Sequence, residues 1–218
     1  RRFWNLPLKF IITELLLIIK FVNKIYFAGF HVIIDKKEGY MEFIEKTLDS
    51  KTVYDGKIIK VLKDDVELSN GQTSIREVVK HSGGVVILAL RDECEECKVL
   101  MVKQYRYPAA KALLELPAGK LEPGEDPLEA AKRELREESG CVAKNWQSLG
   151  FIYTSPGYSD EKLYLYKASD LEFVGECPDE NEILQDCEFY LKDIITKIKI
   201  GEINDAKTIC ALARGCSF

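Results

Sequence analysis

Three glutamates and one arginine recur at helical spacing in one short segment of the chain. Glu137 and Glu138 lie three and four positions after Glu134, so a helix places all three on one face. Arg133 stands four positions before Glu137 and can pair with it. Crowded carboxylates repel one another unless a cation lies among them, and hard oxygen ligands suit Mg²⁺ or Mn²⁺. The segment therefore indicates a divalent-metal site, against the ordinary alternative of a solvated acidic helix face.

The helix that must carry these side chains has clear ends in the sequence. Asp126 is placed to cap it, Pro127 suits its first position, and Glu129 completes an Asp-x-x-Glu capping box. Gly140 can end the helix in a left-handed conformation. These signals predict a helix over residues 127–139.

Together with the loop before it, this helix resembles a known family motif, the Nudix box. The motif is Gly-x5-Glu-x7-Arg-Glu-U-x-Glu-Glu-x-Gly-U, where U is a bulky apolar residue. Cys141 departs from it at the last position, with little consequence expected because cysteine packs as a small hydrophobe. The resemblance runs from about Tyr54 to the C-terminus and leaves out the first forty residues. The matching residues are Gly119, Glu125, Arg133, Glu134, Leu135, Glu137, Glu138 and Gly140.

The resemblance implies an enzyme that hydrolyses a nucleoside diphosphate linked to a further group. In such enzymes a divalent metal neutralises the pyrophosphate and helps to activate or orient water. The resemblance implies Glu134, Glu138 and the backbone carbonyl of Ala118 as metal ligands. It also implies a catalytic group in which Glu137 is a further ligand or its neighbour and Arg133 holds the carboxylates. Glu125 supports the loop.

A second motif indicates the substrate. Pro156 lies 16 residues after Gly140, a distance that resembles the ADP-ribose pyrophosphatase branch, although Pro-Gly alone is only a turn signal. Segments 104–108, 114–119 and 204–208 resemble the same branch. The string that marks NADH pyrophosphatases is missing.

The same branch implies how the substrate is held. Arg106 matches an arginine that contacts the phosphates, and the pair Arg76 and Glu77 matches one at the adenine end. The loop after residue 154 is expected to meet the substrate and its terminal ribose through Ser155, Gly157 and Glu161.

An acidic stretch at residues 178–182 matches a loop that closes over ADP-ribose. The resemblance implies Glu180 as the carboxylate that orients or deprotonates water and Glu182 as a further metal ligand. The alternative is an ordinary solvated loop.

The elements that must position these residues follow an α+β pattern. The sequence predicts strands over 57–68, 75–80, 85–90, 99–105, 150–154 and 163–168, and helices over 127–139, 191–200 and 205–213. Asn70-Gly71 predicts a hairpin between the first two strands. The resemblance implies a Nudix α/β/α sandwich with a mixed sheet over residues 81–218, plus an N-terminal antiparallel β region over 41–80. It also implies a homodimer in which the Arg-Glu pair helps to build the partner's site.

Composition restricts the partners. The 218 residues are 46% hydrophobic and 31% charged, with a net charge of −5, which predicts an ordinary globular protein. No basic stripe indicates a nucleic-acid groove.

Residues 1–40 differ from the rest, being basic and strongly apolar over 10–22. That run is too interrupted for a membrane span, and no cleavage site follows it. We expect upstream sequence read in frame, with the natural product starting at Met41. A membrane-associated amphipathic helix and an ordered extension are the alternatives.

Seven scattered cysteines, an odd number, indicate a reducing cytoplasm. Cys94 and Cys97 form a CxxC pair that we interpret as a polar turn, because a zinc site needs four ligands. A redox or metal role is the alternative.

The resemblance implies Mg²⁺-dependent hydrolysis of ADP-ribose to AMP and ribose 5-phosphate. Two alternatives stay open: hydrolysis of another nucleotide sugar such as GDP-mannose, and a domain that senses ADP-ribose without cleaving it.

Overall fold

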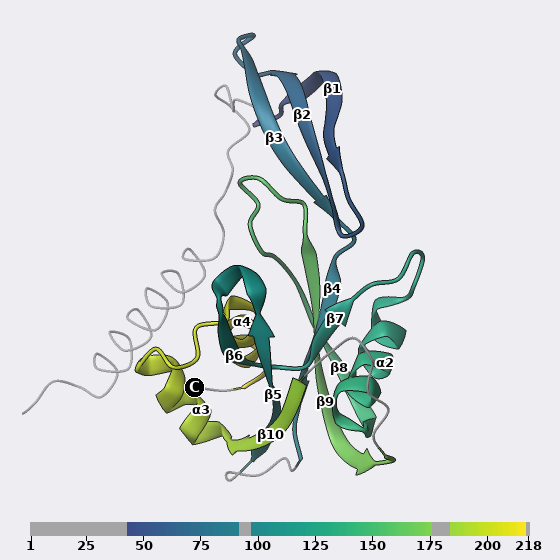
Figure 1. Ribbon diagram of the computed structural model, residues 1–218, viewed down its shortest axis with the longest axis vertical. Coiled ribbons are helices and arrows are strands. Elements are labelled where there is room, and N and C mark those ends of the chain that lie inside the picture. The colour runs from purple at the N-terminus through teal and green to yellow at the C-terminus, as the bar shows by residue number, and fades with distance from the viewer. Residues whose placement is uncertain (1–42, 92–96, 176–183, 217–218) are drawn as a thin grey trace, which may run out of the picture. The chain divides into compact units, whose positions relative to one another are not determined.

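The computed structural model describes residues 43–91, 97–175 and 184–216 (Figure 1). Residues 45–218 form one compact unit, to which every element below belongs. The expectations about residues 1–40, Cys94, Glu180 and Glu182 fall outside the described residues. Within those residues, no helix has the length and apolar character needed to cross a membrane.

An antiparallel sheet opens the unit. It contains β1 (Lys46–Asp55), β2 (Ile59–Glu67) and β3 (Thr73–His81) in that order. The predicted hairpin is confirmed: the Gly71 N–H donates to the Leu68 carbonyl at 2.8 Å, and Gly71 has φ +81°. Glycine takes that left-handed conformation without steric cost.

The central sheet is mixed. Its order is β7 (Ala118–Lys120), β4 (Gly84–Ala89), β9 (Lys162–Phe173) and β8 (Cys141–Tyr153). β4 and β9 run parallel, whereas the other pairs are antiparallel. Every residue of β4 is buried, because the strand is covered on both faces.

A third, antiparallel sheet has the order β10 (Leu184–Tyr190), β5 (Lys98–Arg106) and β6 (Lys111–Glu115). The short 3₁₀ turn η1 (Tyr107–Ala109) joins β5 to β6. Arg106 ends β5, paired with Lys111, and Glu115 ends β6, paired with Val102.

Helices cover both faces of the central sheet (Figure 1). Three α-helices are described: α2 (Pro127–Ser139), α3 (Leu191–Lys199) and α4 (Ala206–Gly215). One buried cluster joins alternate β4 residues such as Val85 and Ile87 to Ala131 and Leu135 of α2.

The other cluster lies on the opposite face of β4. Val86 and Leu88 pack there with Ala211 and Leu212 of α4, because successive strand residues point to opposite sides. The predicted α+β fold, an α/β/α sandwich with a mixed sheet, is confirmed.

The predicted elements agree with the structure to different degrees. The helix over 127–139 is confirmed residue for residue, whereas the expected strand over 150–154 is only the end of β8. β1, β6, β7 and β10 were not predicted. β7 has three residues, too few to show a strand period.

Candidate active site

The ends of α2 fix the position of its acidic face. Asp126 accepts hydrogen bonds from the backbone N–H groups of Leu128 (2.9 Å) and Glu129 (3.3 Å), and Gly140 ends the helix with φ +63°. The Glu129 carboxylate does not complete the predicted capping box among the described contacts. It accepts from Lys132 Nζ at 2.7 Å instead, because both side chains lie at the exposed surface.

Arg133 holds the acidic segment together. Its Nε and Nη2 donate to the two carboxylate oxygens of Glu125 at 3.0 and 3.1 Å. Its Nη1 donates to Glu134 Oε1 (2.8 Å) and Glu137 Oε2 (2.9 Å), and Nη2 also reaches the Lys120 carbonyl at 3.2 Å. The hydrogen bond to Glu125, followed by those to the other glutamates, raises the pKa of Arg133 above its ordinary value.

The loop glutamate of this cluster is correspondingly acidic. Hydrogen bonds from Arg133 and from the Glu122 backbone N–H lower the pKa of Glu125. The structure therefore brings Glu125, Arg133, Glu134 and Glu137 into one ion cluster, as the sequence led us to expect.

Two carboxylates of α2 are buried against β7. Glu134 is 9% exposed and Glu138 is 6% exposed. Glu138 Oε2 accepts a hydrogen bond from the Ala118 backbone N–H at 3.0 Å. A Cβ atom added to Gly119 would lie 1.8 Å from Glu134 Cδ. Only glycine leaves room for the Glu134 carboxylate at this point.

The donor chemistry fits a hard divalent cation. Glu134 and Glu138 lie one helical turn apart and face the backbone of residues 118–119, so their oxygens can share a cation of the kind that carboxylates and carbonyls bind. In the described part of the chain, no three His, Cys, Asp or Glu side chains form a metal-binding group. Glu180 and Glu182, expected to take part, lie outside that part.

Arg106 is oriented by a buried glutamate. Its Nε and Nη2 donate to Glu115 Oε1 (2.9 Å) and Oε2 (2.7 Å). The Arg106 side chain is 37% exposed, whereas Glu115 is 1% exposed. The hydrogen bonds to Glu115 raise the pKa of Arg106, and the nearby charges of Asp205 and Glu138 add to the effect. The expected phosphate-binding arginine thus lies near a buried carboxylate of α2.

Sequence reasoning assigned no role to the charges that surround Glu115. Lys207 Nζ pairs with Glu115 Oε2 and with Asp205 Oδ2. Asp205 also accepts from the N–H and the hydroxyl of Thr208, and so caps α4. The available signal was Glu115 itself: a charge that stands between two leucines requires an opposite charge when it is buried.

The adenine-site candidates do not meet in this structure. Arg76 and Glu77 are adjacent on β3, so their side chains leave opposite faces of the strand. Arg76 Nε donates to Glu45 Oε2 at 2.7 Å, in an ion pair that is partly exposed. Such a pair contributes little stability, so Arg76 can exchange it for a ligand.

The loop between β8 and β9 is hydrogen-bonded to β3, the strand that carries Arg76 and Glu77. The Val79 N–H donates to the Tyr158 carbonyl at 2.7 Å, and the Asp160 N–H donates to the Val79 carbonyl at 3.2 Å. The Ser155 carbonyl accepts from the N–H groups of Tyr158 (3.0 Å) and Ser159 (2.8 Å), which curls the chain around Gly157. The structure therefore places the Ser155–Gly157 turn beside β3.

Glu161 lies at the end of this loop and contacts Thr154 and His81. Its Oε2 accepts from the Thr154 hydroxyl at 2.6 Å, and its Oε1 lies 3.4 Å from His81 Nδ1. His81 Nδ1 also accepts the Gly83 N–H at 3.0 Å.

Comparisons with known proteins agree with this geometry. The family model "NUDIX domain" matches residues 80–212, and "Nucleoside diphosphate sugar hydrolase N-terminal domain" matches residues 45–79. An ADP-ribose pyrophosphatase of Bacillus subtilis (strain 168) is 42% identical over 170 residues, which cover 77% of this chain and 90% of that protein.

Two further relatives are informative. A protein of Bacillus methanolicus named methanol dehydrogenase activator is 42% identical over 172 residues, covering 78% of this chain and 91% of that protein. A crystal structure of an ADP compounds hydrolase has a TM-score of 0.71 and 24% identity, and covers 82% of this chain and 95% of that one. The structural likeness supports the fold.

Proposed function

This chain belongs to the Nudix family of hydrolases, and we propose that it hydrolyses the pyrophosphate bond of ADP-ribose to AMP and ribose 5-phosphate with Mg²⁺. One observation carries the proposal: Arg133 gathers the box carboxylates while Glu138 is hydrogen-bonded to Ala118. The 42% identity to an ADP-ribose pyrophosphatase supports the choice of substrate.

In this proposal, the residues of the site have separate roles. Glu134, Glu138 and the Ala118 carbonyl would hold the cation, which supplies charge neutralisation at the pyrophosphate and an acidified water. Arg133 fixes the Glu134 and Glu137 carboxylates, so they need no reorganisation during reaction.

Arg106 supplies the protein's own contact to the phosphates. Its Nη1 donates no hydrogen bond to the residues that the structure describes, and that corner is free to bind a phosphate oxygen. Addition of one water across the P–O–P bridge then gives two monophosphate products.

The two ends of the substrate are bound by different protomers in this proposal. Arg76 and Glu77 serve the adenine of a substrate in the partner's site, Glu77 through its backbone because its side chain leaves the other face of β3. Ser155, Gly157 and Glu161 serve the terminal ribose of a substrate bound by their own chain. Hydrogen bonds between Val79 and residues 158 and 160 hold this loop in place.

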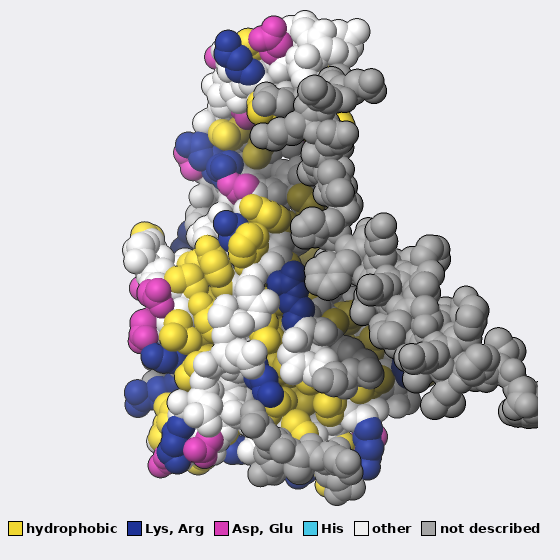
Figure 2. Space-filling view, turned by 180° about the vertical axis from the view of Figure 1, so that it is seen from behind, with side chains coloured by type: hydrophobic (Ala, Val, Ile, Leu, Met, Phe, Trp, Pro, Cys, Tyr) yellow, Lys and Arg dark blue, Asp and Glu magenta, His cyan; other side chains and the backbone are white. Residues whose placement is uncertain are grey.

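We also propose a homodimer formed through the N-terminal sheet. β1 is exposed along its whole length, and large apolar side chains are exposed on β1 and β3, among them Leu48, Val53, Tyr54 and Ile75. In Figure 2 hydrophobic side chains show only in small areas at this sheet, among basic and acidic ones, and the broader hydrophobic area lies over the other sheets. Sedimentation of the protein at micromolar concentration tests the proposal; a monomer at all concentrations would exclude it.

The cytoplasm is the proposed location. The described cysteines form no disulfide with one another, as is usual where thiols stay reduced.

Product analysis tests the proposed activity. ADP-ribose incubated with the protein and Mg²⁺ should give AMP and ribose 5-phosphate in equal amounts on anion-exchange chromatography. Binding without products would support the sensor alternative and overturn the proposal.

A second candidate follows from the Bacillus methanolicus relative, which is as similar as the pyrophosphatase. The chain could act by raising the activity of a dehydrogenase. Adding it to the methanol dehydrogenase of that organism, with and without Mg²⁺, tests this candidate; an unchanged rate of methanol oxidation excludes it.

A further inference from the structure

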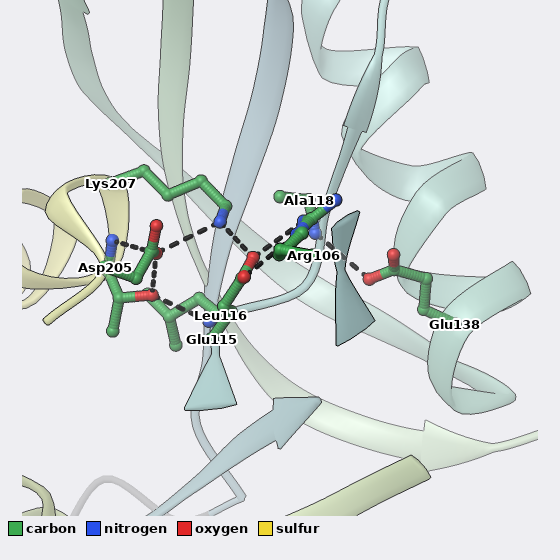
Figure 3. Close-up of polar contacts among 8 residues, drawn as sticks. Arg106, Glu115, Leu116, Ala118, Glu138, Asp205 and Lys207 are labelled. Atoms are coloured by element: carbon green, nitrogen blue, oxygen red, sulfur yellow. Dashed lines mark hydrogen bonds and ion pairs between the residues drawn. The ribbon is translucent and has the colours of Figure 1, made fainter. Parts of the chain in front are cut away.

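We propose that Lys207, acting through Glu115, is a positioning residue for Arg106 and hence for the phosphates of the substrate. The inference rests on the proposed function, because Arg106 is the phosphate contact there. Lys207 is 92 positions from Glu115 in the sequence, yet its Nζ pairs with Glu115 Oε2. Figure 3 shows Glu115 between Lys207 and Arg106.

The contact with Glu115 holds the Nε and Nη2 atoms of the Arg106 guanidinium and leaves its Nη1 atom available. Glu115 Oε1 and Oε2 each accept one hydrogen bond from Arg106, a two-point contact that sets the plane of the group. Because Lys207 contacts Oε2 as well, the carboxylate cannot rotate without breaking both interactions. Arg106 Nη1 is thereby aimed in one direction.

The charges explain why a lysine is needed. Glu115 is almost fully buried, and a buried carboxylate with one cation forms a closed, neutral pair. With Lys207 as a second cation, Arg106 is not the sole counter-charge of Glu115. Lys207 also pairs with Asp205, whose negative charge is further compensated by the Thr208 N–H and the first turn of α4. Arg106 can therefore keep attraction for an approaching anion.

The same turn of α4 also fixes the strand that leads to the metal-site candidate. The Leu116 N–H donates to Thr208 Oγ1 at 2.9 Å, and the Pro117 carbonyl accepts from the Ile87 N–H at 2.8 Å. The N–H of the following residue, Ala118, donates to Glu138 Oε2. Figure 3 shows Leu116 beside the start of α4, and Ala118 with its contact to Glu138. The start of α4 is thus connected to both Arg106 and the acidic face of α2.

A double-mutant cycle tests the proposal. Lys207→Met should raise KM for ADP-ribose about 10- to 100-fold, the usual effect of losing a partner that orients a functional group, with a smaller change in kcat. In an Arg106→Met background the same substitution should change KM little, because the residue acts through Arg106. Lys207→Arg should restore most of the affinity. Lys197→Met, which removes a lysine of α3 that pairs with Glu202 beyond the end of that helix, is the matched control and should behave as wild type.

A readout independent of turnover separates this inference from the proposed function. The Nε–H signal of Arg106 in a ¹H–¹⁵N spectrum should move in Lys207→Met and return in Lys207→Arg, whatever the substrate is. Thermal melting checks that each variant folds, and Lys207→Gln replaces Lys207→Met if the latter does not melt cooperatively. An unchanged Arg106 signal, or additive losses in the cycle, would overturn the positioning role. A moved signal in a protein that leaves ADP-ribose intact would overturn only the proposed activity.

Discussion

The Glu134 carboxylate occupies the space where any residue other than glycine at position 119 would carry its Cβ. That atom would lie 1.8 Å from Glu134 Cδ, well inside the closest approach of two carbon atoms. The glycine that begins the box and the glutamate fifteen residues later therefore depend on each other through direct contact.

Gly119→Ala should displace the Glu134 carboxylate and lower kcat about 100-fold, because misplacing a reacting group by about 1 Å has effects of that size. Steady-state kinetics of Gly119→Ala, Glu134→Ala and the double variant measure the coupling. In the Glu134→Ala background the alanine at 119 should cause little further loss. Fully multiplicative losses would show that Gly119 acts by another route.

Glu138→Gln should lower kcat by at least about 100- to 1,000-fold, the range found when a group that stabilises transition-state charge is removed. The fold should survive, because the glutamine amide oxygen can still accept the Ala118 N–H. Glu129→Gln is the matched control on the same helix, at a side chain that is 64% exposed. Wild-type turnover in Glu138→Gln would remove Glu138 from the reaction.

Arg133→Lys should weaken the acidic cluster although the charge is kept, because an ammonium group cannot bind Glu125 at two points and still reach two other glutamates. We expect the half-saturating Mg²⁺ concentration to rise about 10- to 100-fold. Arg136→Lys, at an exposed position of the same helix, should leave it unchanged. Equal Mg²⁺ dependence in both variants would refute the role of Arg133.

Glu115→Gln should destabilise the protein in a pH-dependent way. Burial alone would raise the pKa of Glu115, but the hydrogen bonds of Arg106 and the charge of Lys207 outweigh burial and lower it. The carboxylate then contributes stability above its unfolded pKa of about 4.3, and that contribution is lost as the pH falls through the lower folded value.

Urea unfolding of wild type and Glu115→Gln measures this effect. The difference in the free energy of unfolding should be about 3 kcal/mol at pH 7, as for one broken partner of a buried pair, and should shrink below about pH 4. A difference that does not vary with pH would contradict the assigned ionisation.

The sequence predicts local features well because their signals are local. Asp126 and Gly140 mark the ends of α2, and spacings of three and four place its glutamates on one face. Contacts between distant segments leave no such pattern. Glu115 meets Lys207 only because β6 and α4 come together in the fold. Arg76 of β3 meets Glu45 only because the chain just before β1 reaches the same sheet.

The most direct test of the central claim is kcat/KM of the wild-type protein for ADP-ribose, ADP-glucose, GDP-mannose and NADH with Mg²⁺, by phosphate-coupled assay. We predict the highest value for ADP-ribose, with hydrolysis lost in Glu138→Gln. A higher value for GDP-mannose or NADH would keep the Nudix chemistry and contradict the substrate. Hydrolysis that persists in Glu138→Gln would contradict the site.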